Sequence, residues 1–96
     1  MDDEIRTHYD LTIECLVRYG GLSYEEAVRK VDASGLFHAD TEAERLLILH
    51  EEPYFWAMEL VYGRSDPQTY WFHNPHLWPP PPDYEHWMKE RLTRRK

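Results

Sequence analysis

The 96-residue sequence contains only one cysteine, and its 11 basic side chains are outnumbered by 18 acidic ones. One cysteine excludes a disulfide framework within the chain and a multi-cysteine zinc site. The formal net charge of −7 disfavours a sequence-general DNA-binding protein, because such a protein needs surplus Lys and Arg to displace counterions. A chain this short leaves no room for a separate cofactor domain, so we expect one domain over residues 1–96.

Long apolar runs and catalytic patterns are also missing. The longest aliphatic run, Leu46 to Leu49, has four residues, far fewer than the roughly 20 that cross a bilayer. Together with an acidic N-terminus, this predicts a cytoplasmic protein that does not associate with membranes. No glycine-rich phosphate loop and no Ser-His-Asp spacing occur. We therefore expect a protein that is not an enzyme and uses no cofactor.

The residues that are abundant are unevenly distributed. Ten of the 14 aromatic residues lie between Tyr54 and Trp87. Residues 1–66 hold 15 acids and six bases, whereas residues 67–96 hold three acids and five bases, all in the last eight residues. The basic end could contact nucleic acid, but the acidic remainder favours a solvated helix end, attracted to the acidic surface of a neighbouring subunit.

Capping residues predict four helices in the first 63 residues. Each segment begins with a capping residue or proline and ends at glycine or proline. The segments are 2–21, 23–35, 41–53 and 53–63. The clearest signals are two capping boxes, Ser23 with Glu26 and Thr41 with Glu44.

The whole pattern predicts an all-α fold of four to five short helices. It divides into a helical core (1–63), a proline- and aromatic-rich strap (64–82, extended from about 67) and a basic C-terminal helix (83–96). Helix pairs joined by short loops should pack antiparallel. The predicted core residues are Ile13, Leu16, Val28, Val31, Leu46, Leu49, Phe55 and Met58.

The strap departs from helical periodicity. Residues 68–72 predict an extended aromatic arm or one helical turn capped by Asp66. Five prolines in the ten residues 73–82 predict a largely polyproline II conformation. Asp83 can then cap the last helix, whose apolar side is expected to hold Tyr84, Trp87, Met88 and Leu92.

The string Leu77-Trp78 followed by four prolines has two interpretations. It resembles the aromatic-led polyproline ligands of EVH1-type domains. Alternatively, it docks its rings on the core of its own domain. We favour the internal strap, because Tyr70, Trp71, Phe72 and Trp78 are too many large rings to leave in water.

Three groups of residues could carry chemistry. His73 and His76 could ligate a metal with His50 or an acid, or could simply be exposed or hydrogen-bonded side chains. Glu51 and Glu52 beside His50 could act as acid and base, but acids before a helix start are favoured by the helix dipole alone. Cys15 lies near an apolar stripe, where a packed, inert thiol is the ordinary outcome.

Part of the chain resembles a known group. The stretches Gly21–Ala27, Ser34–Leu36 and His50–Ala57 are similar to small uncharacterised bacterial proteins of the DUF3791 type, over about residues 12–63. Some of these resemble antitoxin-like or accessory partners of toxins. The resemblance implies a helical protein that binds another protein, and it implies no catalytic residues.

We therefore expect a small acidic protein-interaction module. Its partner is a basic protein or a second copy, with a dimer favoured and direct nucleic-acid binding not expected. Tryptophan and tyrosine dominate interface energetics, so the predicted interface anchors are Trp56, Tyr70, Trp71, Trp78 and Trp87. The alternative is a metal- or ligand-binding protein that uses residues 70–78, His73 and His76 included.

Overall fold

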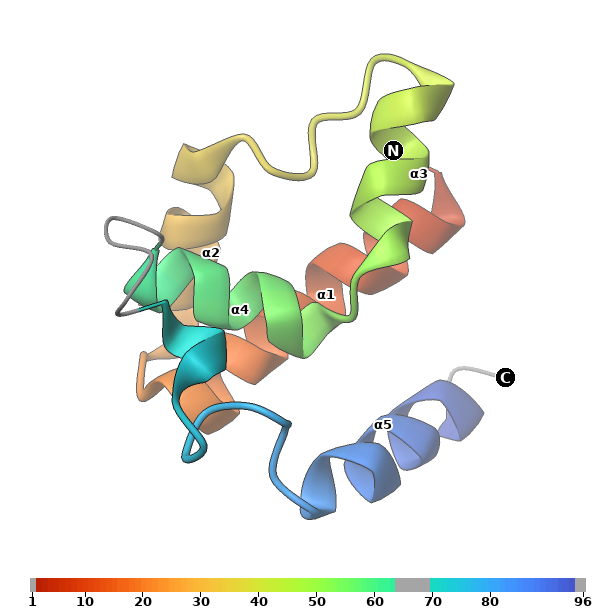
Figure 1. Ribbon diagram of the computed structural model, residues 1–96. Coiled ribbons are helices and arrows are strands. Elements are labelled where there is room, and N and C mark those ends of the chain that lie inside the picture. The colour runs from red at the N-terminus through yellow and green to blue at the C-terminus, as the bar shows by residue number, and fades with distance from the viewer. Residues whose placement is uncertain (1, 64–69, 95–96) are drawn as a thin grey trace.

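The computed structural model describes residues 2–63 and 70–94, and it confirms an all-α fold (Figure 1). Within those two ranges there are five α-helices, one short 3-10 helix and no strand. The elements are α1 (Asp3–Gly20), α2 (Tyr24–Ser34), α3 (Glu42–His50), α4 (Pro53–Tyr62), η2 (Trp71–His73) and α5 (Asp83–Arg94).

The first two helices have the predicted caps. The Asp2 carboxylate accepts a hydrogen bond from the Ile5 amide at 2.9 Å, and the capping box of Ser23 and Glu26 is complete. Gly21 ends α1 in the left-handed region at φ 74°, which residues with a side chain rarely adopt. Because these signals act over a few residues, they fix the helix boundaries independently of the packing.

The next two helices follow the prediction with one correction. Thr41 caps α3 by accepting from the Glu44 amide at 3.1 Å. However, the Glu44 carboxylate accepts from the Thr41 hydroxyl instead of the Thr41 amide, so the second capping box is only half formed. Pro53 is the first residue of α4, where its missing amide costs nothing, and Gly63 follows the last.

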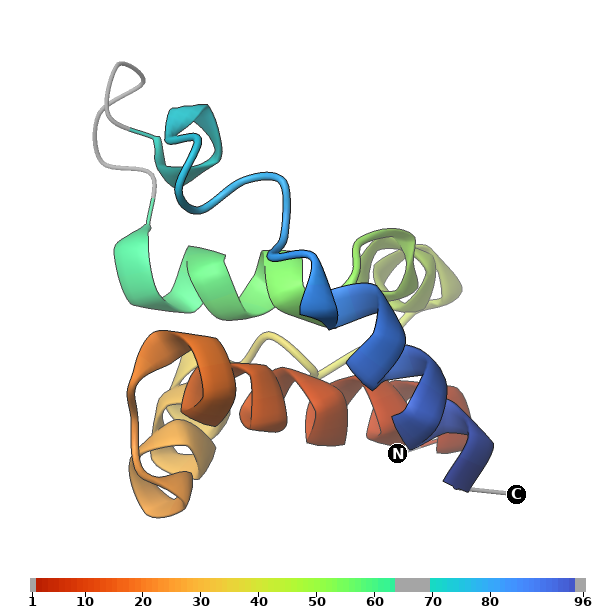
Figure 2. The same ribbon diagram turned by 90° about the horizontal axis from the view of Figure 1, so that it is seen from below.

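The fold is built around α1 and α4, which pack along each other in the same direction (Figure 2). The start of α1 lies near the start of α4, since His8 Nε2 hydrogen-bonds to the Glu51 carbonyl at 2.7 Å. Their ends also meet, because a Cβ added at Gly20 would lie 3.3 Å from Val61. The expectation of antiparallel packing concerned helices joined by short loops, which α1 and α4 are not. It is wrong for α3 and α4, since α3 lies across α4 (Figure 1). Helices α1 and α4 run in the same direction because α3 brings the chain back to the start of α1 before α4 begins.

The predicted core is correct except at Leu46. Ile13, Leu16, Val31 and Met58 are buried, and Val28, Leu49 and Phe55 pack partly buried against them. Leu46, however, is 56% exposed and Leu47 is 62% exposed, while the adjacent Ile48 is buried.

Arg45 accounts for this difference. Its guanidinium binds the carboxylates of Asp2 at 2.8 Å and Glu4 at 2.7 Å, which lie around the start of α1. Ile48 and Leu49 follow Arg45 by three and four residues, so they share its face and turn toward α1. Leu46 and Leu47 consequently face outward.

The strap is less extended than predicted. Trp71–His73 form a 3-10 turn, with the Asn74 amide donating to the Trp71 carbonyl at 2.9 Å. Asn74 then starts a second turn, because its side-chain oxygen accepts from the His76 amide at 2.9 Å, and Pro75 suits the bend. Polyproline II is therefore the wrong expectation for His73 to Leu77. The alternative of a turn capped by Asp66 falls on a residue outside the described ones.

The last helix, α5, lies on the side of the molecule away from α3 (Figure 1). Asp83, predicted as its cap, is its first residue, and the carboxylate accepts from Arg18 of α1 at 2.7 Å. Tyr84 is buried and Trp87 and Met88 are half-buried, as predicted. Leu92 is 45% exposed, so the apolar side of α5 reaches the body only over its first turns.

Candidate functional site

Two leucines on the outer side of α3 form the clearest apolar surface. Leu46 and Leu47 lie beside Ala43, which is also exposed, and we call these three residues the leucine face. Aliphatic side chains of this size are normally turned inward in a small domain, since burying one stabilises by about 1.5–3 kcal/mol. The exposure of two adjacent leucines therefore marks a surface that a partner could cover.

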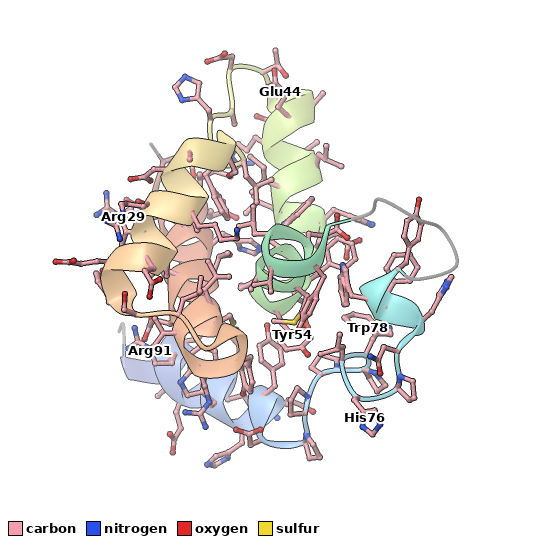
Figure 3. The ribbon with its side chains drawn as sticks, turned by 90° about the vertical axis from the view of Figure 1, so that its left-hand side faces the viewer. Arg29, Glu44, Tyr54, His76, Trp78 and Arg91 are labelled. Carbon is pink, nitrogen blue, oxygen red and sulfur yellow. The ribbon has the colours of Figure 1, made fainter. Side chains whose placement is uncertain are left out.

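Two carboxylates flank the leucine face. Glu42 and Glu44 lie on α3 itself, with Glu44 at its outer end (Figure 3), whereas Asp3 and Glu4 lie on the first turn of α1, which the opposite side of α3 faces. A shallow hollow of about 380 Å³ lies between these two helices, with Leu49 and the acids Asp3 and Glu4 in its lining. This hollow lies on the side of α3 opposite the leucine face, so the acids at the edges of that face are Glu42 and Glu44.

Arg45, on the side of α3 opposite the leucine face, is already paired. Arg45 binds Glu42 at 3.2 Å in addition to Asp2 and Glu4, so three carboxylates offset its charge. The pKa of the Asp2 carboxyl is lowered, first by the Ile5 amide that it accepts from and then by Arg45. The Asp2 carboxylate therefore remains ionised at neutral pH.

Three of the predicted anchors lie on α4 or pack against it. The Trp71 ring is 2% exposed, with its centroid 5.2 Å from that of Phe55, and its Nε1 donates to Glu59 at 2.6 Å. The Trp78 ring stacks on Tyr54 and turns toward α4 (Figure 3). Trp56 donates from Nε1 to the Ile48 carbonyl at 2.9 Å. These indoles bind other parts of the same chain, as the internal-strap interpretation predicts.

The other two anchors lie elsewhere and are only partly buried. Trp87 of α5 packs under Arg18, whose guanidinium lies 5.5 Å from the ring centroid. Tyr70 lies beside Phe72 and His73 at the outer side of η2. The five predicted anchors therefore do not form one patch, and none of them belongs to the leucine face.

The histidines proposed as metal ligands are exposed. The His73 ring lies 4.7 Å from that of Phe72, and His76 points outward from the strap (Figure 3). Across residues 2–63 and 70–94, no group of three or more His, Cys, Asp or Glu side chains is arranged to hold a metal ion. His50 lies apart from both, on α3.

The other residues that could carry chemistry are either buried in the core or lie on the surface. Cys15 is fully buried, and desolvation raises the pKa of its thiol, so the reactive thiolate is disfavoured. His50 lies 3.7 Å from the Glu51 carboxylate on the surface. Glu52 stands at the cap position of α4, where the helix dipole favours an acid.

A groove of about 700 Å³ between α1 and α5 is lined mainly by charges that are paired within the chain. Arg91 binds Glu14 across the groove, and Arg6 lies 3.4 Å from Asp10. Arg18 binds Asp83. A charged ligand would have to displace these pairs, so the groove is a weaker candidate for a binding site than the leucine face.

Comparison with protein-family models, curated proteins and solved structures finds no match for this chain. The similarity to the DUF3791 type therefore stays a prediction. Within the described ranges, no helix is long and apolar enough to cross a bilayer.

Sequence reasoning missed the leucine face because it placed Leu46 in the core. The run Leu46 to Leu49 is apolar on every side of a helix, so its periodicity does not show which residues turn inward. The available signal was Arg45, one residue before the run, in a chain whose N-terminus is strongly acidic.

Proposed function

We propose that this protein is a non-enzymatic interaction module that binds a basic protein segment on the leucine face of α3. The observation that carries the proposal is the exposure of Leu46 and Leu47 on α3, with Glu42 and Glu44 on either side of them. An amphipathic helix that presents apolar residues flanked by Lys or Arg matches both parts of that surface. The net negative charge of the chain would also speed encounter with such a partner.

This role agrees with the accessory or neutralising function that the sequence resemblance implies. A neutraliser must cover a basic surface, and this chain has a net charge of −9 over residues 1–66. The end of α3 is held against α4, because Trp56 donates from Nε1 to the Ile48 carbonyl. A rigid face loses less conformational entropy on binding.

The proposal is tested with a defined probe instead of an unknown partner. A synthetic amphipathic helix of leucine and lysine is titrated into the full chain and followed by calorimetry and by NMR shifts of the α3 amides. A peptide of the same composition in scrambled order controls for charge alone. We expect the amphipathic peptide to bind at least tenfold more tightly and to shift residues 43–47.

The matched variant is Leu46→Gln with Leu47→Gln, which keeps helix propensity and removes the apolar surface. We expect it to weaken peptide binding at least tenfold. Tyr24→Gln, at an equally exposed residue at the start of α2, should leave binding unchanged. Equal binding of the two peptides, or of the wild type and the leucine variant, would contradict the proposal.

A further inference from the structure

Helix α5 is attached to the body by few contacts. Within residues 83–93, Tyr84 is buried, Trp87, Met88 and Arg91 are half-buried, and the remaining side chains are exposed. Open space flanks the helix on two sides, as the groove of about 700 Å³ toward α1 and as a hollow of about 380 Å³ beside prolines 80–82. Helix α5 therefore rests on the body along a narrow strip.

Two ion pairs tie α5 to α1. Asp83 binds Arg18 at 2.7 Å, and Arg91, two turns further along α5, binds Glu14, one turn earlier in α1. Among the described residues, Arg91 Nε is buried and has no hydrogen-bond partner, which opposes the docked position. The attachment therefore depends largely on two charge pairs and one buried ring.

The buried ring of α5 covers a small part of the body. The Tyr84 ring centroid lies 5.4 Å from that of Tyr54 and 6.1 Å from that of Tyr19. Cys15, one turn before Tyr19 in α1, is fully buried. Burial raises the pKa of the Tyr84 hydroxyl and the Cys15 thiol raises it further, so these two side chains are neighbours. Helix α5 thus covers two tyrosines and a thiol.

The strap before α5 is fixed by contacts of its own. Tyr54 Oη donates to the Leu77 carbonyl, and the Trp71 and Trp78 rings pack against Phe55 of α4. The four prolines 79–82 then lead into α5. Because the strap does not rely on α5 for these contacts, the helix can leave the body without pulling the strap away.

We propose that α5 is a lid that opens as one unit while α1 to α4 stay folded, and that its two ion pairs with α1 keep it closed. Opening exposes Tyr19, Tyr54 and Cys15. The lid lies on the side of the molecule away from the leucine face, so this inference does not depend on the proposed function (Figures 1 and 2).

Amide hydrogen exchange of the full chain, followed by NMR at low urea concentrations, tests the opening. A helix of 12 residues is marginal on its own, so α5 amides lose protection when the helix leaves the body. We expect the interior amides of α5 to share one opening with a smaller urea dependence than those of α1 and α4, because less surface is exposed. Exchange of α5 only together with α1, or residue by residue from its end, would overturn the proposal.

Variants of the ion pairs test what keeps the lid closed. Arg91→Gln should accelerate exchange in α5 roughly tenfold and Asp83→Asn roughly threefold, because the Arg91 pair is the less exposed of the two. Arg91→Lys keeps the charge and should recover part of the loss. Arg6→Gln is the matched control, since Arg6 lines the same groove but pairs with Asp10 within α1. Equal exchange in Arg91→Gln and Arg6→Gln would contradict the proposal.

Salt distinguishes the lid from the whole chain. Raising NaCl from about 0.05 M to about 1 M screens the ion pairs and should accelerate exchange in α5. The same salt relieves repulsion within a chain of net charge −7, so exchange in α1 and α4 should not accelerate. Equal acceleration in all helices, or none in α5, would count against the ion pairs.

The Cys15 thiol reports what the lid covers. Alkylation by iodoacetamide should proceed through the same opening, so Arg91→Gln should accelerate it by the same factor as exchange in α5. The rate for each variant unfolded in urea corrects for intrinsic reactivity. Alkylation with the urea dependence of α1 would show that the lid does not cover the thiol, and the proposal would fail.

Discussion

The two ends of this molecule are held in place by different physical means. Residues 3–62 form four helices with local caps, and their aliphatic side chains pack between α1, α2 and α4. Residues 70–94 have little aliphatic core of their own. They are held by rings packed on α4 and by hydrogen bonds from single side chains, such as Tyr54 Oη donating to the Leu77 carbonyl at 2.5 Å. The second region depends on the first for its position, and the first does not depend on the second for its helices.

Trp71→Ala should have the largest effect, because it weakens the attachment of the second region to the first. The ring is almost fully buried between η2 and α4, so its loss leaves a cavity and removes the indole that donates to Glu59. We expect a loss of about 3–5 kcal/mol in the free energy of unfolding, measured by urea denaturation. As urea is added, the folded NMR signals of α1 and α2 should persist to higher concentrations than those of residues 70–94.

Trp71→Phe is the matched control, because it keeps a ring in the same site and should cost less than the alanine variant. If Trp71→Ala costs less than about 1 kcal/mol, the strap is not anchored as described. If α1 melts together with the strap at all denaturant concentrations, the two regions are one cooperative unit.

Ser23→Ala should have an intermediate effect that is confined to the first region. It removes one bond of the capping box, in which the Glu26 amide donates to the Ser23 hydroxyl at 3.1 Å. The expected loss is about 1 kcal/mol, seen as a lower Tm in thermal denaturation. Ser23→Asp should restore most of it, because an aspartate also caps well. A variant that changes the strap resonances more than those of α2 would contradict the separation.

Asp83→Asn should have the smallest effect and should show the dependence of α5 on charge. Arg18 lowers the pKa of the Asp83 carboxyl through their hydrogen bond. Stability from a lowered carboxyl pKa is present above the unfolded value and is lost as the pH falls through the folded one. The wild type should therefore exceed the variant slightly in Tm above about pH 4, and the difference should vanish in more acidic solution. A difference that grows on acidification would contradict the ion pair.

The same contrast explains how much could be predicted from the sequence. The ends of α1, α2 and α4 follow from Asp2, Ser23, Pro53 and the glycines, because capping acts within a few residues. The turn at Asn74 was missed because the proline count dominated the interpretation. The orientation of α3 could not be predicted, because it depends on ion pairs between Arg45 and carboxylates about 40 residues away in sequence.

The sequence predicted an interaction surface at the tryptophans, whereas the candidate site lies elsewhere. Acidity and the lack of catalytic patterns pointed to an interaction surface, and the tryptophans were expected to form it. In the structure, Trp56, Trp71 and Trp78 pack within the chain, and Leu46 and Leu47 are exposed side by side on α3. Composition identifies aromatic residues, but only the tertiary packing decides which of them remain available.

The parallel pairing of α1 and α4 has a consequence for how the chain folds. The two helices that make the centre of the molecule are separated by α2 and α3, so their contacts close a long loop. An antiparallel hairpin of neighbouring helices would bury the same surface earlier and faster. During synthesis, the apolar side of α1 stays uncovered by its main partner until Pro53–Tyr62 has left the ribosome, and the aromatic segment that covers α4 is made later still.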